Sequence, residues 1–347
     1  MQNSRDKSVL IIYTGGTIGM VQDQVSGALV PVNFEKISEE VPELNRIGCK
    51  IETVAFDPPI DSSNVNPDIW IEIAQIIQQN YTSYDGFVIL HGTDTMAYTA
   101  SALSFMLENI EKPVILTGSQ LPIGTLRTDG KENLISSIQI ATEYQYNAPM
   151  VPEVCIFFEN QLFRGNRTTK NNADHFNAFS SDNYPALAET GIHIKYNYAY
   201  IRYPAVKREL VLHTRLNTHI AVLKLFPGIS SDIVRAMLRI KGLRAVVLES
   251  YGSGNAPSLP WLIDEVKSAI NRGLFMLNVT QCHAGSVEMN RYETGIELLK
   301  AGVVSGYDST TEAAVTKLMF LLGEYENEPE QILKNLNNSL RGEVTIQ

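Results

Sequence analysis

Residues 8 to 20 read Ser-Val-Leu-Ile-Ile-Tyr-Thr-Gly-Gly-Thr-Ile-Gly-Met, an apolar run that stops at a glycine pair between two threonines. The run from Val9 to Ile12 is short and continuous, which predicts a buried strand. Glycine has no Cβ, so the main chain at Gly15 and Gly16 can approach a small ligand while Thr17 offers it a hydroxyl. We therefore expect a buried strand that ends in a ligand-binding turn.

The same arrangement recurs at residues 86 to 96, where Gly-Phe-Val-Ile-Leu runs into His-Gly-Thr-Asp-Thr-Met. In an open parallel sheet, ligands bind at the carboxyl ends of the strands where the strand order reverses. We expect Thr17 and Thr93 to face each other across such a crevice. A single turn of this kind is more often only a strand end, but a second copy that carries Asp94 favours a functional site.

Predicted strands and helices alternate along most of the chain, which is typical of right-handed βαβ units. With 347 residues the chain exceeds a typical single domain. We predict an α/β protein with a larger N-terminal domain (1-195), whose mostly parallel sheet is flanked by helices. A connection (196-218) with short strands then leads to a smaller C-terminal α/β domain (219-347). The predicted strands are 9–12, 51–56, 87–90, 113–116, 154–158, 220–226, 244–248 and 274–279; the predicted helices are 67–79, 95–107, 131–144, 230–239, 259–271, 295–300, 311–322 and 328–336.

Four segments between these elements carry polar residues that bear on function. Residues 20–33 have no sustained periodicity and predict a loop, either a lid beside Thr17 or an ordered surface connection. The turn-rich segment 57–64 brings Ser62 and Ser63 to the same edge if the sheet is parallel. Asp94 is placed to cap the following helix, which does not exclude catalysis. Residues 164–170 predict a loop, in which Lys170 is either functional or part of a solvated surface turn.

Composition excludes several classes of protein. Lysine and arginine number 28 against 38 acidic residues, a net charge of −10 without any basic block, so nucleic acid is not expected as a partner. The three cysteines, Cys49, Cys155 and Cys282, lie far apart and predict neither a disulfide framework nor a zinc site. No signal sequence and no membrane-spanning apolar run is seen, so we expect a cytoplasmic protein that does not enter a membrane.

The glycine turns do not have dinucleotide or phosphate-loop spacing, and neither a serine-hydrolase elbow nor a zincin motif is present. His91 is either a base or, as we prefer, a buried structural histidine. A threonine is a poor nucleophile unless a neighbour takes its proton. Lys170 could do so, although a carboxylate such as Asp94 favours its charged form. Backbone N–H groups in the glycine turns could stabilise an oxyanion. The pattern predicts acyl transfer from a small polar substrate.

The motifs 14–19 (Thr-Gly-Gly-Thr-Ile-Gly) and 91–96 (His-Gly-Thr-Asp-Thr-Met) resemble the two signatures of bacterial-type L-asparaginases. Segments 61–63, 164–170 and 251–257 resemble the cytoplasmic type I branch. The resemblance spans nearly the whole chain. It implies hydrolysis of L-asparagine to L-aspartate and ammonia, without metal or organic cofactor, by a two-domain α/β protein that forms a homodimer or a dimer of dimers.

The resemblance also implies roles for individual residues. Thr17 matches the nucleophile that forms the acyl-enzyme, and the set Thr93, Asp94 and Lys170 matches the residues linked to proton transfer and water activation. Further positions match groups that face or hold the substrate: Gly16, Ser62, Ser63 and Gly92, with Thr93 and Asp94 also in contact with it.

Two departures from the family pattern stand out. The family usually has a tyrosine in the loop after the first motif, whereas residues 21–33 contain none and offer only Ala28 or Leu29 at the nearest positions. We therefore expect Lys170, acting through Thr93 or water, to carry more of the proton transfer. Some type I members have an effector site that uses a cysteine, a threonine and an arginine. Cys282 and Thr169 match the first two, but Glu249 would repel an amino-acid carboxylate, so hyperbolic kinetics are expected.

Alternatives to a selective L-asparaginase stay open. A dual glutaminase-asparaginase would need to accept one extra methylene, which is typically worth only about 1–3 kcal/mol in discrimination. A non-catalytic amino-acid sensor could keep the crevice, although it would have no need for a nucleophile. The asparaginase-like subunit of a tRNA-dependent amidotransferase is not expected at this net charge. A contribution of Glu288 or Glu293 to a neighbouring site is a further possibility in an oligomer.

Overall fold

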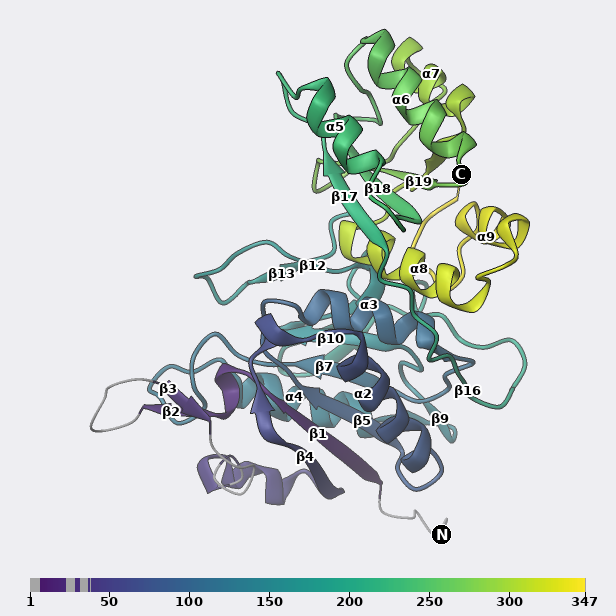
Figure 1. Ribbon diagram of the computed structural model, residues 1–347. Coiled ribbons are helices and arrows are strands. Elements are labelled where there is room, and N and C mark those ends of the chain that lie inside the picture. The colour runs from purple at the N-terminus through teal and green to yellow at the C-terminus, as the bar shows by residue number, and fades with distance from the viewer. Residues whose placement is uncertain (1–6, 23–28, 32–36, 38, 347) are drawn as a thin grey trace. The chain divides into compact units, whose positions relative to one another are not determined.

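The computed structural model describes residues 7–22, 29–31, 37 and 39–346 (Figure 1). It divides into two compact units, Met1–Leu212 and His213–Gln347. The division falls within the predicted connection 196-218, and the domain bounds 1-195 and 219-347 stay a prediction.

The first unit is built on an eight-stranded sheet with the order β15-β14-β11-β10-β7-β5-β1-β4. The five strands from β10 to β4 are parallel and the other three are antiparallel, so the predicted mostly parallel sheet is confirmed. The strands are β1 (Ser8–Gly15), β4 (Lys50–Ile60), β5 (Gly86–Leu90), β7 (Val114–Thr117), β10 (Val154–Phe158), β11 (Gln161–Arg164), β14 (Ala188–Thr190) and β15 (Ile194–Tyr196).

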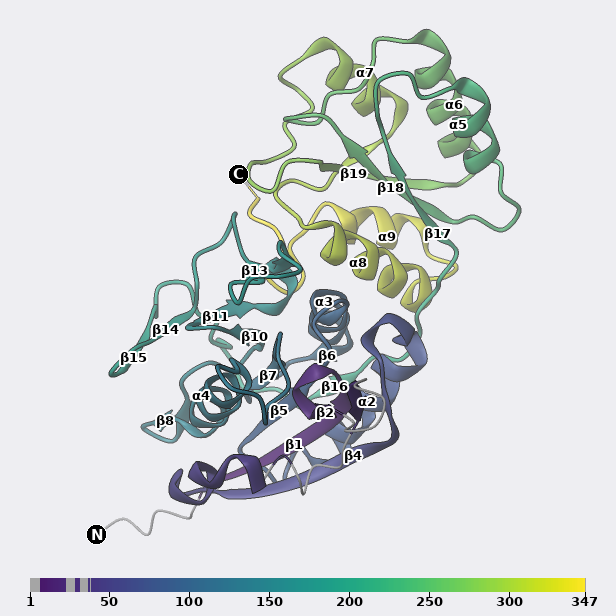
Figure 2. The same cartoon turned by 90° about the vertical axis from the view of Figure 1, so that its left-hand side faces the viewer.

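Three helices cover the two faces of this sheet: α2 (Pro67–Asn80), α3 (Met96–Met106) and α4 (Gly130–Thr142). Figure 2 shows α4 on one side of β5 and β7 and α3 on the other, and α2 packs against α3. Helix α2 begins where the sequence predicts, because Pro67 occupies its first turn and the Asn66 side chain accepts hydrogen bonds from two backbone N–H groups.

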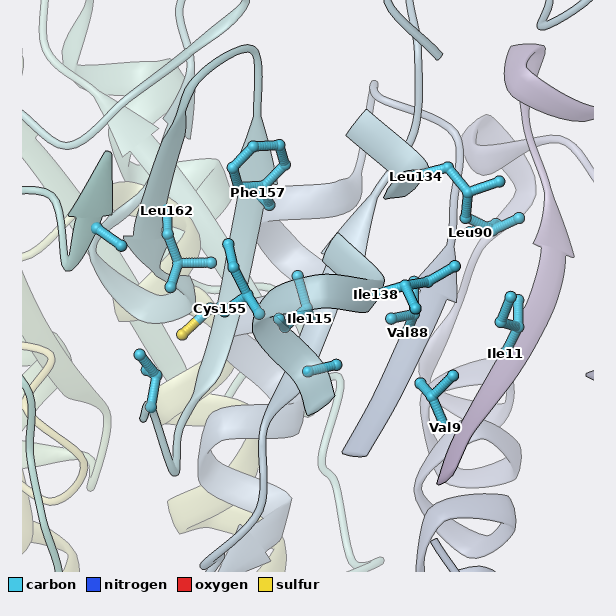
Figure 3. Packing of buried hydrophobic residues seen from close by; sticks show 14 of the residues in the cluster. Val9, Ile11, Val88, Leu90, Ile115, Leu134, Ile138, Cys155, Phe157 and Leu162 are labelled. Atoms are coloured by element: carbon cyan, nitrogen blue, oxygen red, sulfur yellow. The ribbon is translucent and has the colours of Figure 1, made fainter. Parts of the chain in front are cut away.

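The core on the α4 side follows the two-residue period of the strands (Figure 3). Alternate residues of β1, β5, β7 and β10 point toward the helix, and their neighbours along each strand are buried on the other face. Burial on both faces explains why these strands read as continuous apolar runs. The α4 face includes Val9, Ile11, Val88, Leu90, Ile115, Leu134, Ile138, Cys155 and Phe157.

The strand order reverses at β1. Strand β4 pairs with β1 on one side, and the chain then returns through α2 to place β5 on its other side. The turns that follow β4, β1, β5 and β7 therefore leave four neighbouring parallel strands at the same edge of the sheet. The turns that contain Thr17, Ser62, Ser63 and Thr93 therefore all lie at this edge.

Short elements complete the first unit. They are η1 (Thr17–Gly19), β2 (Met20–Gln22), β3 (Leu29–Pro31), η2 (Pro42–Arg46), η3 (Ser62–Asn64), β6 (Leu107–Glu108), β8 (Tyr144–Gln145), β9 (Ala148–Pro149), η4 (Gly165–Arg167), β12 (Thr169–Lys170), β13 (Phe179–Ser180) and β16 (Val211–Leu212). The short strands form four antiparallel pairs: β2 with β3, β8 with β9, β12 with β13, and β6 with β16.

Three local predictions were wrong. Residues 20–33 are not all loop, because β2 and β3 pair there; residues 23–28 and 32–33 lie outside the described residues. Strand β4 continues through the two prolines to Ile60, which is possible because β4 is an edge strand and does not need every backbone N–H. Segment 164–170 is not a solvated turn, since residues 165–168 are buried.

The second unit has a four-stranded parallel sheet, β17-β18-β19-β20, in chain order. Its apolar core joins the strands to α5, α6 and α7 on one face, while α8 packs on the strands and on α9. The elements are β17 (Ile220–Lys224), α5 (Ser231–Leu238), β18 (Ala245–Ser250), α6 (Pro260–Asn271), β19 (Phe275–Thr280), α7 (Glu293–Ala301), β20 (Val304–Ser305), α8 (Thr311–Glu324) and α9 (Pro329–Leu336). Only β20 was not predicted.

A buried ion pair ties the last residues to α8. Lys317 Nζ lies 2.8 Å from Glu343 Oε1, and both side chains are at most 3% exposed. Backbone N–H groups of Leu340 and Arg341 also donate to the Glu343 carboxylate. Burial alone would raise the pKa of Glu343, but the Lys317 charge and the backbone donors outweigh it and lower that pKa.

Replacing Glu343 with Gln should therefore lower the free energy of unfolding by about 3–5 kcal/mol, because it leaves the Lys317 ammonium buried without a counter-charge. Since the pKa of Glu343 is lowered, the stabilisation is complete above the usual glutamate range and is lost as the pH falls toward the lowered pKa. Urea unfolding at several pH values measures both effects. The exposed Glu297→Gln on α7 is the matched control, and an equal midpoint for the two variants would refute this prediction.

Candidate active site

The turn that carries Thr17 is held by close backbone packing. Gly16 has φ 90°, and a Cβ there would lie 2.5 Å from the backbone N of Gly92. Only glycine fits both the conformation and the space. Next to it, the phenol of Tyr13 donates to the Gly19 carbonyl at 3.0 Å, and the backbone N–H of Ile123 donates to the Ile18 carbonyl at 3.3 Å. The half-buried Thr17 thus begins a turn that is fixed on three sides.

The turns after β5 and β4 are in equally close contact. A Cβ on Gly92 would lie 2.5 Å from Ser62 Oγ, and the Thr95 hydroxyl donates to the Ser62 carbonyl at 2.7 Å. Ser62 is buried, whereas Ser63 is exposed and its N–H donates to the Asp61 side chain. Gly16, Gly92 and Ser62 therefore lie in one stack at the sheet edge.

Lys170 lies against the second threonine turn. Its Nζ donates to Thr93 Oγ1 at 2.8 Å and to Asp94 Oδ1 at 2.7 Å. The Lys170 side chain is 16% exposed and that of Asp94 67% exposed. Pairing of β12 with β13 fixes Lys170 opposite Phe179. The structure thus brings together the hydroxyl, the amine and the carboxylate that the sequence named separately.

The predicted capping role of Asp94 was wrong. Helix α3 begins at Met96, and the N-cap residue is Thr95, which makes no side-chain capping bond. Asp94 therefore lies one residue before the N-cap, and its carboxylate accepts from Lys170 instead. An unused cap leaves this carboxylate available to a ligand's amino group.

His91 is a structural residue, as the sequence analysis preferred. The Trp70 indole donates to Thr99 Oγ1 at 3.0 Å, Thr99 lies 2.9 Å from His91 Nε2, and His91 Nδ1 lies 2.7 Å from the Gly92 carbonyl. Indole can only donate and a carbonyl can only accept, so the chain is satisfied with the proton on Nδ1. Burial lowers the pKa of His91 to about 4. The imidazole is neutral and holds the Gly92 turn in place.

Three residues at this edge were not singled out from the sequence. Gln120 lies beside Thr93, with its Oε1 accepting from Thr93 Oγ1 at 3.4 Å. The Asp129 carboxylate accepts from the backbone N–H of Gln120 at 3.0 and 3.1 Å, and Tyr13 supports the Thr17 turn. The signal that could have indicated Gln120 is the polar turn at residues 117–120, which follows the predicted strand 113–116, but no local pattern indicates its bond with Thr93.

The other predicted residues lie next to Lys170, belong to the second unit, or fall outside the described part. Ala28 and the side chain of Leu29 belong to the latter, so the position of the missing tyrosine is not described. Thr169 precedes Lys170 in the first unit. In the second unit Cys282 is exposed, and the Glu249 carboxylate accepts from Thr311 at 2.8 Å and pairs with Lys224 at 3.2 Å. Glu288 and Glu293 also lie in the second unit.

The described residues contain no group of three or more His, Cys, Asp or Glu side chains that could hold a metal ion. Among the helices described in Figure 1, none has both the length and the apolar character needed to cross a membrane.

A hydroxyl at a glycine turn, a second hydroxyl bonded to an amine, and nearby backbone N–H groups are the parts of an acyl-transfer site.

Comparisons with known proteins identify the family. The family described as Asparaginase, N-terminal matches residues 8–202, and Glutaminase/Asparaginase C-terminal domain matches residues 219–335. L-asparaginase 1 of Escherichia coli strain K12 is 46% identical over 340 residues, covering 98% of each chain. The crystal structure of L-asparaginase I from Vibrio cholerae superimposes with a TM-score of 0.89 at 43% identity, covering 99% of this chain and all of the other.

The mouse 60 kDa lysophospholipase is 41% identical over 364 residues, which is 98% of this chain and 63% of that protein. The fold and the sheet-edge site place the protein among two-unit α/β hydrolytic enzymes. The chain belongs to the asparaginase family, and it matches both parts of that family in the expected order.

Gly16→Ala should abolish most activity, by about 100-fold or more, because the added Cβ would displace the Gly92 backbone and separate the two turns. Steady-state ammonia release measures the effect. The control is Gly191→Ala, where the nearest atom to an added Cβ is 4.0 Å away. Full activity in Gly16→Ala would show that the contact of the turns is not required.

The His91 imidazole should not titrate between about pH 5 and 8, since burial lowers its pKa to about 4. NMR of ¹³C-labelled histidine measures this directly. Because the unfolded chain binds the proton more tightly, the stability of the fold is unaffected above about pH 6.5 and falls as the pH drops from there toward 4. A His91 signal that titrated near pH 6.5 would contradict the structural role.

Proposed function

We propose that this protein is an L-asparaginase, which hydrolyses L-asparagine to L-aspartate and ammonia through a threonine acyl-enzyme. The observation that carries the proposal is the contact of Gly16 with Gly92, which sets Thr17 beside the turn of Thr93 and Lys170. Membership of the asparaginase family and 46% identity to L-asparaginase 1 of Escherichia coli support the substrate.

Thr17 is the nucleophile of the proposed reaction. Its Oγ attacks the side-chain amide carbon of asparagine, and the C–N bond breaks as ammonia leaves with an added proton. Backbone N–H groups in the glycine turns stabilise the oxyanion. Water then attacks the acyl carbon, and the bond to Thr17 Oγ breaks to release aspartate. The contacts of Gly16, Ile18 and Gly19 hold the turn in position, which lowers the ordering entropy that is lost at the transition state.

Thr93, Asp94 and Lys170 move the protons of both steps in this proposal. Lys170 is mostly shielded from solvent and bonded to Thr93, which favours transfer through the threonine hydroxyl over direct exchange with bulk water. No tyrosine occurs in residues 21–33, so this path carries more of the proton transfer here. Asp94 also binds the substrate α-amino group through its exposed carboxylate.

The remaining predicted residues bind the substrate. Buried Ser62, in contact with Gly92, and exposed Ser63 hold the α-carboxylate and α-amino ends of asparagine. The main chain at Gly16 and Gly92 faces the ligand. This arrangement lets the charged ends of a small amino acid set the position of its amide relative to Thr17.

A dual glutaminase-asparaginase is the second candidate function, because the C-terminal part matches a family described as Glutaminase/Asparaginase. One additional methylene separates the two substrates, and a pocket discriminates against it by only about 1–3 kcal/mol. The preference is therefore a matter of relative kcat/KM for the two amides.

We further propose a cytoplasmic protein that assembles as a homodimer or a dimer of dimers, with domains at 1-195 and 219-347 joined by 196-218. The three cysteines are unpaired, which suits a reducing compartment. Light scattering at several protein concentrations tests the assembly, and a monomer at micromolar concentration would refute it.

Ammonia release from L-asparagine and L-glutamine, measured for the wild type, Thr17→Ala and Lys170→Met, tests the proposed function. We expect asparagine to be favoured in kcat/KM, and each variant to lose at least about 1,000-fold in kcat. Wild-type kinetics should be hyperbolic. Substantial turnover by Thr17→Ala would exclude Thr17 as the nucleophile, and asparagine binding without turnover in the wild type would favour a sensor.

A further inference from the structure

Gln120 connects three parts of the candidate site. Its side-chain oxygen accepts from Thr93 Oγ1 at 3.4 Å, and its Nε2 donates to the His175 carbonyl at 3.0 Å. Its backbone N–H is fixed by the Asp129 carboxylate at 3.0 and 3.1 Å. The side chain thus lies between the second threonine turn and the segment that follows Lys170.

These partners determine which way the Gln120 amide points. A backbone carbonyl can only accept, so the amide NH₂ group must face His175 and the amide oxygen must face Thr93. An ammonium can only donate, so the Thr93 oxygen accepts from Lys170. The single hydroxyl proton of Thr93 is therefore directed to Gln120 and away from Lys170.

A hydroxyl has one proton and two lone pairs. With the proton on the Gln120 side and one lone pair facing Lys170, the second lone pair of Thr93 Oγ1 is left for another donor. In the proposed reaction that donor is the Thr17 hydroxyl or the attacking water. The resting arrangement makes Thr93 an acceptor before substrate binds.

We propose that Gln120 is a positioning residue that sets the direction of the Thr93 proton and thereby prepares Thr93 to receive a proton from the nucleophile. The inference rests on the proposed function of this site. It assigns no contact with substrate to Gln120, which acts through Thr93.

The proton transfer balances as follows. With Lys170 in its neutral form, the nucleophile gives its proton to Thr93 Oγ1 while Thr93 gives its own proton to Lys170 Nζ. The Thr93 proton stays on the Gln120 side only while Lys170 is an ammonium. Once Lys170 is neutral, its lone pair can accept, and the hydroxyl turns from Gln120, whose bond is long at 3.4 Å, to Lys170 at 2.8 Å. A long hydrogen bond is weak, so the amide orients the hydroxyl without trapping it. The same path returns the proton to the leaving ammonia or to Thr17.

A carboxylate in place of this amide would act differently. It would accept the Thr93 proton more strongly and add a negative charge close to Lys170. Lys170 pairs directly with Asp94, and the Asp129 carboxylate accepts from the backbone N–H of Gln120. The neighbouring His91 is buried and neutral, and His175 presents its carbonyl to Gln120. A second carboxylate beside Lys170 would stabilise the ammonium further and delay its loss of a proton as the pH rises.

The test compares Gln120→Met and Gln120→Glu with the wild type over a range of pH. Met keeps the length of the side chain but offers no acceptor, so we expect kcat for L-asparagine to fall about tenfold with KM changed less than about twofold. For Gln120→Glu we expect the acid limb of kcat/KM to move up by about one pH unit. Gln139→Met and Gln139→Glu, on the exposed side of α4, are the matched controls and should behave like the wild type.

A second measurement does not depend on turnover. Acetylation of Lys170 by acetic anhydride, followed by mass spectrometry against pH, reports when the amine loses its proton. Gln120→Glu should raise the midpoint for Lys170 by about one pH unit, while Gln120→Met and both Gln139 variants should leave it within about 0.3 unit of the wild type. A general loosening of the fold would lower kcat in both Gln120 variants without this difference between them.

The proposal would be overturned if Gln120→Met kept the wild-type kcat. It would also be overturned if Gln120→Glu left both the acid limb of kcat/KM and the acetylation midpoint of Lys170 unchanged. The proposed function fails separately, if the wild type releases no ammonia from L-asparagine. In that case a raised acetylation midpoint in Gln120→Glu would still support the orientation of Gln120 toward Thr93 and Lys170.

Discussion

The site depends on the contact between two glycine main chains, Gly16 and Gly92. A Cβ on Gly16 would lie 2.5 Å from the Gly92 backbone, and a Cβ on Gly92 would lie 2.5 Å from Ser62 Oγ. No other residue type allows this stack, in which the ends of three neighbouring parallel strands touch. The stack decides where Thr17 and Thr93 lie relative to each other.

The rest of the first unit keeps this stack in place. Burial of β1 and β5 on both faces fixes the strands beneath the turns, because a shift in register would exchange the side chains packed on the two faces of the sheet. Behind the Gly92 turn, Trp70, Thr99 and His91 form a buried chain of hydrogen bonds. A neutral imidazole suits this position, since a charged one would be desolvated without a counter-charge.

Most of the fold and part of the site could be predicted from the sequence. Continuous apolar runs and helical periodicity gave nearly every long element, and strand-end turns identified Thr17, Thr93 and Ser62. The predicted strand 51–56 ended too early, because the two prolines of β4 indicate a turn unless it is known that β4 lies at the edge of the sheet. The bond of Gln120 with Thr93 and the pairing of Asp94 with Lys170 join residues distant in the chain, so no local pattern indicates them.

We propose that this backbone stack places Thr17, and not Thr93, to form the acyl-enzyme. The most direct test is rapid acid quenching of the wild type during turnover of L-asparagine, followed by peptide mapping with mass spectrometry. We expect a β-aspartyl ester on the peptide that begins at Ser8 and contains Thr17, formed as fast as the first ammonia is released. An ester on Thr93, or ammonia release with no acylated threonine at any time, would contradict it.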